Sequence, residues 1–570
     1  MKRRDQSQTE QLRKALAERE ARLQEAQARL AALEGSTSLQ VGRALTGAAK
    51  KPGRGLVRLP RELYRLWRGS SGAGGHATGG RVRGATEPVR SYDAERQEAR
   101  LLAGQATARD DRIVIAGILS AEARAALEHC ARIIPLRPHD VQVVFDSVDV
   151  DLVLVSASAA RPGNLWAHVG SPAAVDRTRA LRWVLESAAA RGVPSILVKD
   201  VPAPPALAGL GFEHVHDGDL GVPLHRFNPI AAEPERGAVP VHVSGAAAAP
   251  ALPPALAGQG PDRIVRAEPA WDGLPDTLRA AASAVVDTAA LADRAAACGA
   301  RALLVGARPE PDLPQSVART GAGAEDLARV AAAGPLTPGE LRLALRSIFL
   351  ARATPVRLAE LLERVSLAPG SGSPALPLAG RAVAVLARPL DDTESLALAD
   401  DVFRQRHPPA EIVVPASRVR FAGVERLRAR GFAVRAVPDP ERGASPYGEW
   451  ARLAAAATTP WTALWESPGG ESLLADALCA AECSGADAVG PAVTAGGGTG
   501  GRSGADDLGW AAAGQEYVFV SEVRPVLARR DLVRKGLHPG VWSRHGARLL
   551  ALGDLRPTGH DTAPDHAHAG

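Results

Sequence analysis

The chain has 570 residues, which is long enough for two or three domains that each bury a hydrophobic core. Its formal net charge of +5 is too close to balance to indicate a nucleic-acid-binding protein. Four cysteines do not form a disulfide framework at this length, and no run of about 18 apolar residues occurs, so we expect a cytoplasmic protein with neither a signal peptide nor a membrane span.

Residues 1–35 are predicted to form a coiled-coil helix. Leucines recur at spacings of three and four over 5–34, with charged residues and glutamines between them. Arg19 interrupts this heptad pattern, and Gly35 ends the helix. The pattern indicates either a coiled coil that makes the protein a homodimer or a single solvated helix.

Residues 36–108 are predicted to form a basic amphipathic arm and a glycine-rich linker. Lysines and arginines within 43–68 are interleaved with leucines, Tyr64 and Trp67. This composition is typical of a helix that lies on an anionic membrane surface, and equally of a solvated charged linker. We therefore expect either peripheral contact with the inner face of the cell membrane or a simple spacer, with a flexible hinge at 69–85.

Residues 109–367 are predicted to be an α/β region with parallel sheets. Apolar runs that alternate with helical patterns indicate a parallel sheet flanked by helices. The expected strands are 112–117, 150–155 and 195–198, with a helix at 180–190. After a Pro/Ala-rich crossing at 246–256, a second set of helices and strands runs over 264–367 and ends in one long amphipathic helix at 338–365.

A further domain is predicted at 379–555, after a low-complexity linker at 368–377. It begins with a strand, a helix and a second strand, at 382–386, 394–404 and 411–414. Within it, Cys479 and Cys483 lie one helical turn apart without a histidine nearby, so we expect core packing and not metal binding. The tail at 556–570 is expected to be disordered.

Several stretches of the first α/β region carry a family resemblance. They are 149–157 (DVDLVLVSA), 189–194 (AARGVP), 224–229 (LHRFNP), 295–300 (AAACGA) and a helix with Arg346, Thr354, Arg357 and Leu361. With these stretches the region resembles the CgeB-like glycosyltransferases, which are two-lobed (GT-B type). The resemblance implies that a nucleoside diphosphate sugar binds between the lobes with no obligatory metal.

The resemblance implies a donor-binding turn at Cys298 and Gly299, where the family's backbone closely approaches the ligand. The family places an acid one turn earlier, able to grip a ribose. The equivalent residue here is Arg294, or Asp293 if the register shifts by one. Arg294 would either meet a phosphate, whose oxygens suit a guanidinium fork, or be a surface residue of an inactive lobe.

Lys199 and Asp200 are a second pair of donor-binding candidates. They follow a predicted strand, and open α/β sheets bind ligands at the carboxyl ends of their strands. The alternative is a salt bridge within a loop. His168 and His225 are the other polar candidates of this region.

Stretches of the second region resemble another family. They are 381–386 (RAVAVL), 405–414 (QRHPPAEIVV), 454–461 (AAAATTPW) and 473–489 (LLADALCAAECSGADAV). They are similar to the family-2 glycosyltransferases, which have a doubly wound GT-A type domain. In that family an acidic pair at a strand end holds a divalent metal against the donor diphosphate.

The chain departs from this family at its acidic residues. Pro468 stands where the second metal-binding acid would lie, which leaves Glu466, and 415–417 reads Pro-Ala-Ser where the family reads the base and ribose. A divalent metal at Glu466 would need further oxygen ligands, of which Glu471 is the nearest candidate. Both glutamates are the candidate catalytic residues, a late base being Glu516 or Asp531. The pattern favours the loss of metal-dependent donor binding.

Together these patterns predict an α/β protein with a helical arm, a two-lobed Rossmann-like (GT-B type) region and a GT-A-like doubly wound domain. The predicted function is transfer of a sugar from a nucleotide sugar to a cell-surface polysaccharide, a teichoic-type polymer, a spore-coat glycan or a lipid-linked acceptor. A catalytically inactive scaffold that binds a glycan or a partner transferase is the main alternative. A membrane-surface adaptor is a third.

Overall fold

The computed structural model describes residues 112–230, 232, 235–244, 253–267, 271–307, 313–365, 377–439, 445–493 and 517–553. The predicted coiled coil, basic arm and tail lie outside these residues, as do nearly all of the linker at 368–377 and Glu516. None of the helices in the described part is long and apolar enough to cross a membrane.

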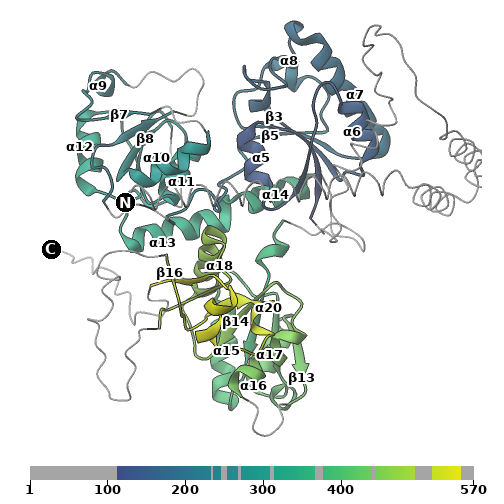
Figure 1. Cartoon of the computed structure of the whole chain (residues 1–570), viewed down its shortest axis with the longest axis vertical. Coiled ribbons are helices and arrows are strands. Elements are labelled where there is room, and N and C mark those ends of the chain that lie inside the picture. The colour runs from purple at the N-terminus through teal and green to yellow at the C-terminus, as the bar shows by residue number, and fades with distance from the viewer. Residues whose placement is uncertain are drawn as a thin grey trace, which may run out of the picture. The chain divides into compact units, whose positions relative to one another are not determined.

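The first lobe is a five-stranded parallel sheet in the order β2-β1-β3-β4-β5, with helices on both faces (Figure 1). β3 is LVLVS and is buried throughout, as expected for a strand covered on both sides. The strands are β1 (Val114–Ile118), β2 (Arg132–Pro135), β3 (Leu152–Ser156), β4 (Ser195–Lys199) and β5 (His214–Asp217), and the helices α5 (Ala121–Leu127), α6 (Val141–Ser147), α7 (Val175–Arg191) and α8 (Pro205–Ala208). The predicted strands correspond to β1, β3 and β4.

The second lobe is another five-stranded parallel sheet, in the order β10-β9-β8-β6-β7. Its strands are β6 (Val241–Val243), β7 (Val265–Arg266), β8 (Ser283–Val286), β9 (Arg301–Leu304) and β10 (Ala318–Thr320). Its helices are α9 (Pro254–Ala257), α10 (Leu274–Ala280), α11 (Ala289–Ala297), α12 (Ala324–Ala333) and α13 (Pro338–Ser347). The lobe therefore begins at β6, before the predicted start at 264.

The long helix predicted at 338–365 is wrong as a single element. The structure has α13, a π-helical turn η4 (Ile348–Arg352) and α14 (Thr354–Arg364). Ala353 between them is extended and pairs with Val222, and Pro355 in the first turn of α14 has no N–H with which to continue the helix. The break turns α14 onto the first lobe, where Leu358, Leu361 and Leu362 join its core.

The C-terminal domain is an eight-stranded mixed sheet in the order β13-β12-β11-β14-β17-β15-β18-β16. β11 to β14 are parallel, whereas β17 runs antiparallel to both of its neighbours. The strands are β11 (Val383–Ala387), β12 (Glu411–Pro415), β13 (Ala433–Val437), β14 (Trp461–Trp465), β15 (Ala488–Gly490), β16 (Val518–Val520), β17 (Leu527–Arg529) and β18 (Leu549–Ala551). The helices are α15 (Asp392–Arg404), α16 (Ala422–Ala429), α17 (Pro446–Ala456), α18 (Leu473–Ser484) and α20 (Arg530–Val533).

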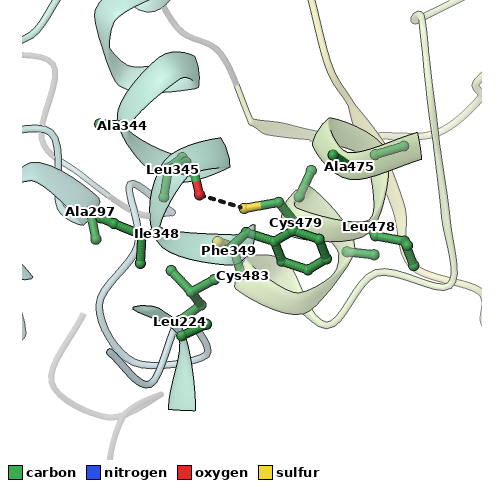
Figure 2. Packing of buried hydrophobic residues seen from close by; sticks show 14 of the residues in the cluster. Leu224, Ala297, Ala344, Leu345, Ile348, Phe349, Ala475, Leu478, Cys479 and Cys483 are labelled. Carbon is green, nitrogen blue, oxygen red and sulfur yellow. Dashed lines mark hydrogen bonds between the residues drawn. The ribbon is translucent and has the colours of Figure 1, made fainter. Parts of the chain in front are cut away.

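One hydrophobic core joins the C-terminal domain to the second lobe. Leu345, Ile348 and Phe349 from α13 and η4 pack against Leu478 and Cys479 of α18 (Figure 2). The Cys479 thiol donates to the Leu345 carbonyl at 3.6 Å. Both cysteines of α18 are buried, which confirms the prediction of core packing for them.

Candidate functional site

Four polar residues gather at the carboxyl edge of the first lobe's sheet. Ser120 follows β1 and caps α5, Ser156 ends β3, Ser158 lies in the 3-10 turn after it, and Asp200 follows β4. The chain crosses from one side of β1 to the other between β2 and β3, so this edge is a topological switch point. Crevices of this kind are where open α/β sheets bind ligands.

The Asp200 carboxylate is held by Ser158. One oxygen accepts from the Ser158 N–H at 2.9 Å, and the other accepts from the Ser158 hydroxyl. That hydroxyl lies 2.9 Å from the hydroxyl of Ser120 and 3.1 Å from that of Ser156. Burial raises the pKa of Asp200 above its usual range, against the lowering effect of the bonds from Ser158. Lys199 pairs with Asp217 at 2.9 Å and not with Asp200.

Arg294 of α11 reaches from the second lobe to the first. Its guanidinium pairs with Glu122 of α5 at 2.6 Å, and its side chain is only 12% exposed. It also lies over the rings of Phe227 and Trp271, 5.4 and 5.2 Å from their centres. Its Nε and the Trp271 Nε1 are buried without a hydrogen-bond partner among the described residues. Arg294 is therefore a buried residue between the lobes.

Asp293 and the turn at Cys298 and Gly299 make their contacts within the second lobe. Asp293 forms a buried ion pair with Arg352 at 2.9 Å. Gly299 has φ +85°, and a Cβ there would lie 2.6 Å from Arg236, which donates to the Cys298 carbonyl at 2.9 Å. In the structure the Arg236 side chain lies closely against this turn, and donor binding there stays a prediction. Burial raises the pKa of the Cys298 thiol to about 12.

The two histidine candidates of the first α/β region lie apart from this edge network. His225 stacks on His129 with 4.9 Å between ring centres, and burial followed by the charge of His129 lowers its pKa to about 4. His168 is exposed, with φ +62°.

In the C-terminal domain, Glu466 and Glu471 are both engaged by arginines. Glu466 follows β14 and pairs with Arg524, whose Nε lies 3.2 Å from the carboxylate. Glu471 pairs with Arg406, and the exposed Asp531 pairs with Arg534 at 3.2 Å. No group of three metal-ligating side chains occurs among the described residues. A divalent metal at Glu466 would have to displace Arg524 and take its other ligands from water and phosphate oxygens.

A cavity of about 700 Å³ lies beside Glu466. Asp401 of α15, Gln405 just after that helix and Arg524 in the segment before β17 contribute to its lining. The sequence analysis did not identify these three residues as site candidates. The sequence analysis did not identify Ser120 and Ser158 either. The signal that could have identified them is a serine just beyond each of two strands that end at the same sheet edge.

No protein-family model and no curated protein matches the chain. Among solved structures, it is similar to S. aureus TarS 1–349, at 13% identity and a TM-score of 0.23, over 31% of this chain and 59% of that one. The same TarS segment in complex with UDP gives 12% identity and a TM-score of 0.24, over the same shares. The chain thus spans less than two thirds of these structures. A likeness at this level assigns neither a fold nor an activity.

Proposed function

We propose that this protein is a glycosyltransferase with its reaction site at the carboxyl edge of the first lobe. The observation that carries the proposal is the Ser120–Ser158–Asp200 network at a topological switch point. Burial is the main cause of the raised pKa of Asp200, and the negative charge of Glu122, which binds Arg294, adds to it. Asp200 and Arg294 therefore have Glu122 as a common charged neighbour.

The chemistry of each group suits sugar transfer. The Arg294 fork matches the oxygens of a diphosphate, and the aromatic rings beneath it fix its plane. Asp200 would take the proton of the acceptor hydroxyl as its oxygen attacks the anomeric carbon. The bond from that carbon to the diphosphate breaks, and the nucleoside diphosphate leaves with the electron pair. A raised pKa brings Asp200 nearer to the pH at which a general base works best.

The proposal includes the acceptor classes expected from the sequence. These are a cell-surface polysaccharide, a teichoic-type polymer, a spore-coat glycan or a lipid-linked glycan. The arm at 36–108 would hold the enzyme at the inner face of the membrane, and the helix at 1–35 would form a homodimer. Comparing membrane association of the full chain with that of a chain lacking 1–69 tests the arm.

Replacing Asp200 tests the reaction site. Asp200→Asn should lower sugar transfer by about 10²–10⁴-fold, because the amide cannot take a proton, and should leave nucleotide-sugar binding unchanged. Asp217→Asn is the matched control, since it removes the partner of Lys199 at the neighbouring strand end. Screening uridine and guanosine diphosphate sugars by calorimetry gives the donor. Failure of the wild-type protein to bind any of them would remove the proposal.

A charge swap separates a phosphate-binding Arg294 from a structural one. Arg294→Glu alone should abolish donor binding and weaken the contact between the lobes. The double variant Arg294→Glu, Glu122→Arg restores the ion pair with its charges reversed. Recovered stability without recovered donor binding supports the role for Arg294, whereas recovery of both shows that only the pair matters.

The second candidate function is a scaffold that binds a glycan or a partner transferase. The observation that favours it is that Glu466 and Glu471 both lie in ion pairs with arginines. Titrating nucleotide sugars distinguishes the two functions, because only the transferase has to bind a donor in the first lobe. Tight binding that is lost in Arg294→Glu would contradict the scaffold.

A further inference from the structure

The cavity beside Glu466 has walls that are mainly aliphatic. Val385, Ala463 and Leu464 line it from the sheet, Val402 from α15, Leu474 from α18 and Val526 from the start of β17. Three prolines complete the wall, and prolines offer no N–H donor. A volume of about 700 Å³ is in the range of cavities that enclose a small-molecule ligand.

Two polar side chains that line the cavity, Gln405 and Asp401, already form hydrogen bonds within the protein. The Gln405 amide donates to the Gly470 carbonyl at 3.0 Å and accepts from the Leu474 N–H at 3.1 Å. The Trp465 indole donates to Asp401 at 3.0 Å, and the Gly469 N–H donates to the same carboxylate oxygen at 3.1 Å. A hydroxyl-rich ligand would therefore give up its bonds to water and find few partners in return.

The charges at the cavity do not suit the phosphates of a nucleotide. Glu466 and Arg524 neutralise each other, and both side chains are about half exposed. Asp401 is 4% exposed, and its second oxygen has no hydrogen-bond partner among the described residues. Its nearest cation is Arg404, 3.9 Å away. Neither group offers an unopposed positive charge to the phosphates of a nucleotide.

We propose that this cavity binds the aliphatic chain of an amphiphile, with the polar head of that molecule left at the Glu466–Arg524 pair. Each methylene that enters the cavity is removed from water, so affinity grows with the length of the enclosed chain. The inference goes beyond the transfer reaction proposed above and stands without it. It assigns to the C-terminal domain the recognition of a lipid chain, such as an acyl or prenyl group.

Displacement of a fluorescent fatty acid tests the inference on the full-length protein. Dansylated undecanoic acid should bind with enhanced fluorescence, and both laurate and farnesyl phosphate should displace it. Inorganic phosphate and uridine diphosphate should not displace it. Stronger displacement by laurate identifies an acyl chain and stronger displacement by farnesyl phosphate a prenyl chain.

Three variants test whether the dye binds in this cavity. Val493 lines the cavity and is 47% exposed, so Val493→Trp should narrow the cavity and weaken dye binding about tenfold. Leu396→Trp adds the same indole at a residue of α15 that is 39% exposed and does not line the cavity, and it should leave binding unchanged. Val526→Thr keeps the volume of the wall and adds a hydroxyl, so it should cause a smaller loss. Absence of dye binding, displacement by uridine diphosphate, or equal losses in the two tryptophan variants would overturn the inference.

Discussion

At the scale of single residues, Asp200 and Asp401 are two aspartates with raised pKa values that differ in what surrounds them. Asp200 has a serine network that can receive and pass a proton at a sheet edge. Asp401 is held through one oxygen by an indole and a backbone N–H, and its other oxygen has no hydrogen-bond partner among the described residues. Burial raises the pKa of both carboxyls. The first environment suits proton transfer, whereas the second disfavours the charged form of a carboxyl in the cavity wall.

Asp401 should make the protein less stable as the pH rises. Its pKa is raised in the folded state, so its contribution is fully present below the ordinary aspartate pKa and is lost as the pH rises through the folded value. Asp401→Asn removes this ionisation. The free energy of unfolding of the wild type should therefore fall relative to the variant as the pH rises above about 4. Urea denaturation at a series of pH values measures the free energy of unfolding of both proteins. Parallel curves of this free energy against pH for the wild type and the variant would contradict the prediction.

His225 should produce the opposite dependence on pH. Its pKa is lowered from 6.5 to about 4, first by burial and then by the charge of His129. The unfolded chain therefore binds a proton more readily, and stability should fall as the pH drops from 6.5 towards 4. His225→Phe keeps a flat ring against His129 and should flatten the profile in that window. Thermal unfolding across the window tests this, and an unchanged slope would assign the effect to other groups.

Residue patterns predicted part of the candidate site. A strand followed by Lys199 and Asp200 places both at the carboxyl edge of a sheet, and the structure has them there. The partner of Asp200 is 42 positions away at Ser158, which local sequence does not reveal. Asp401 meets Trp465 and Gly469 only because the loop after β14 folds back over α15. Strand-end residues follow from periodicity, whereas contacts between a loop and a distant helix do not.

At the scale of elements, α15 and α16 approach each other closely at Gly423. A Cβ at this position would lie well within 3.0 Å of the Ser395 carbonyl of α15. Gly423→Ala should therefore destabilise the protein by about 1–3 kcal/mol, because the two helices must separate. Gly339→Ala in α13 is the matched control, since a Cβ added there would meet nothing within 4 Å, and it should stabilise by up to about 1 kcal/mol. Urea denaturation measures the change in the free energy of unfolding for both variants. Equal changes would show that α15 and α16 are not in tight contact at Gly423.

The contact of α13 with α18 is flanked by an ion pair that should be costly to break. Arg346 donates twice to Asp476, at 2.8 and 2.7 Å, and the aspartate is 7% exposed. Arg346→Leu leaves that carboxylate buried without its partner, which should cost about 3–5 kcal/mol. Replacing both residues by leucine removes both charges and should cost much less. A double-mutant cycle by urea denaturation measures the coupling, and additive losses would contradict it.

Periodicity predicted α13 and α14 as one helix and missed the turn between them. Both halves carry apolar residues at helical spacing, so the pattern alone does not show a break. The signal was Pro355, which lacks an N–H and commonly stands in a first turn. The extended backbone at Ala353 depends on its pairing with Val222, which is distant in sequence.

At the scale of the whole molecule, the domain boundary in the sequence is not a boundary in packing. The linker at 368–377 suggests an independent C-terminal domain, yet the core of that domain continues into the second lobe. The burial of α18 explains why the core continues across the boundary. Ten of its residues, from Leu474 to Ser484, are buried. A helix that is apolar on all sides must be covered on all sides. The sequence of α18 predicts that the helix is covered by other elements, but it does not reveal that α13 and η4 cover it.

The C-terminal domain should therefore not fold well when it is cut from the chain. A fragment of residues 377–570 would expose the face of α18 that Leu345, Ile348 and Phe349 cover, and would leave Asp476 without Arg346. We expect this fragment to self-associate, because it gains an apolar surface with no partner. Size-exclusion chromatography and hydrogen exchange measure the outcome, with the full chain as control, and a monomeric fragment with native protection in α18 would contradict it. Ligand binding by the two regions is for this reason best assigned with single variants in the full chain, Asp200→Asn for the sheet edge and Val493→Trp for the cavity.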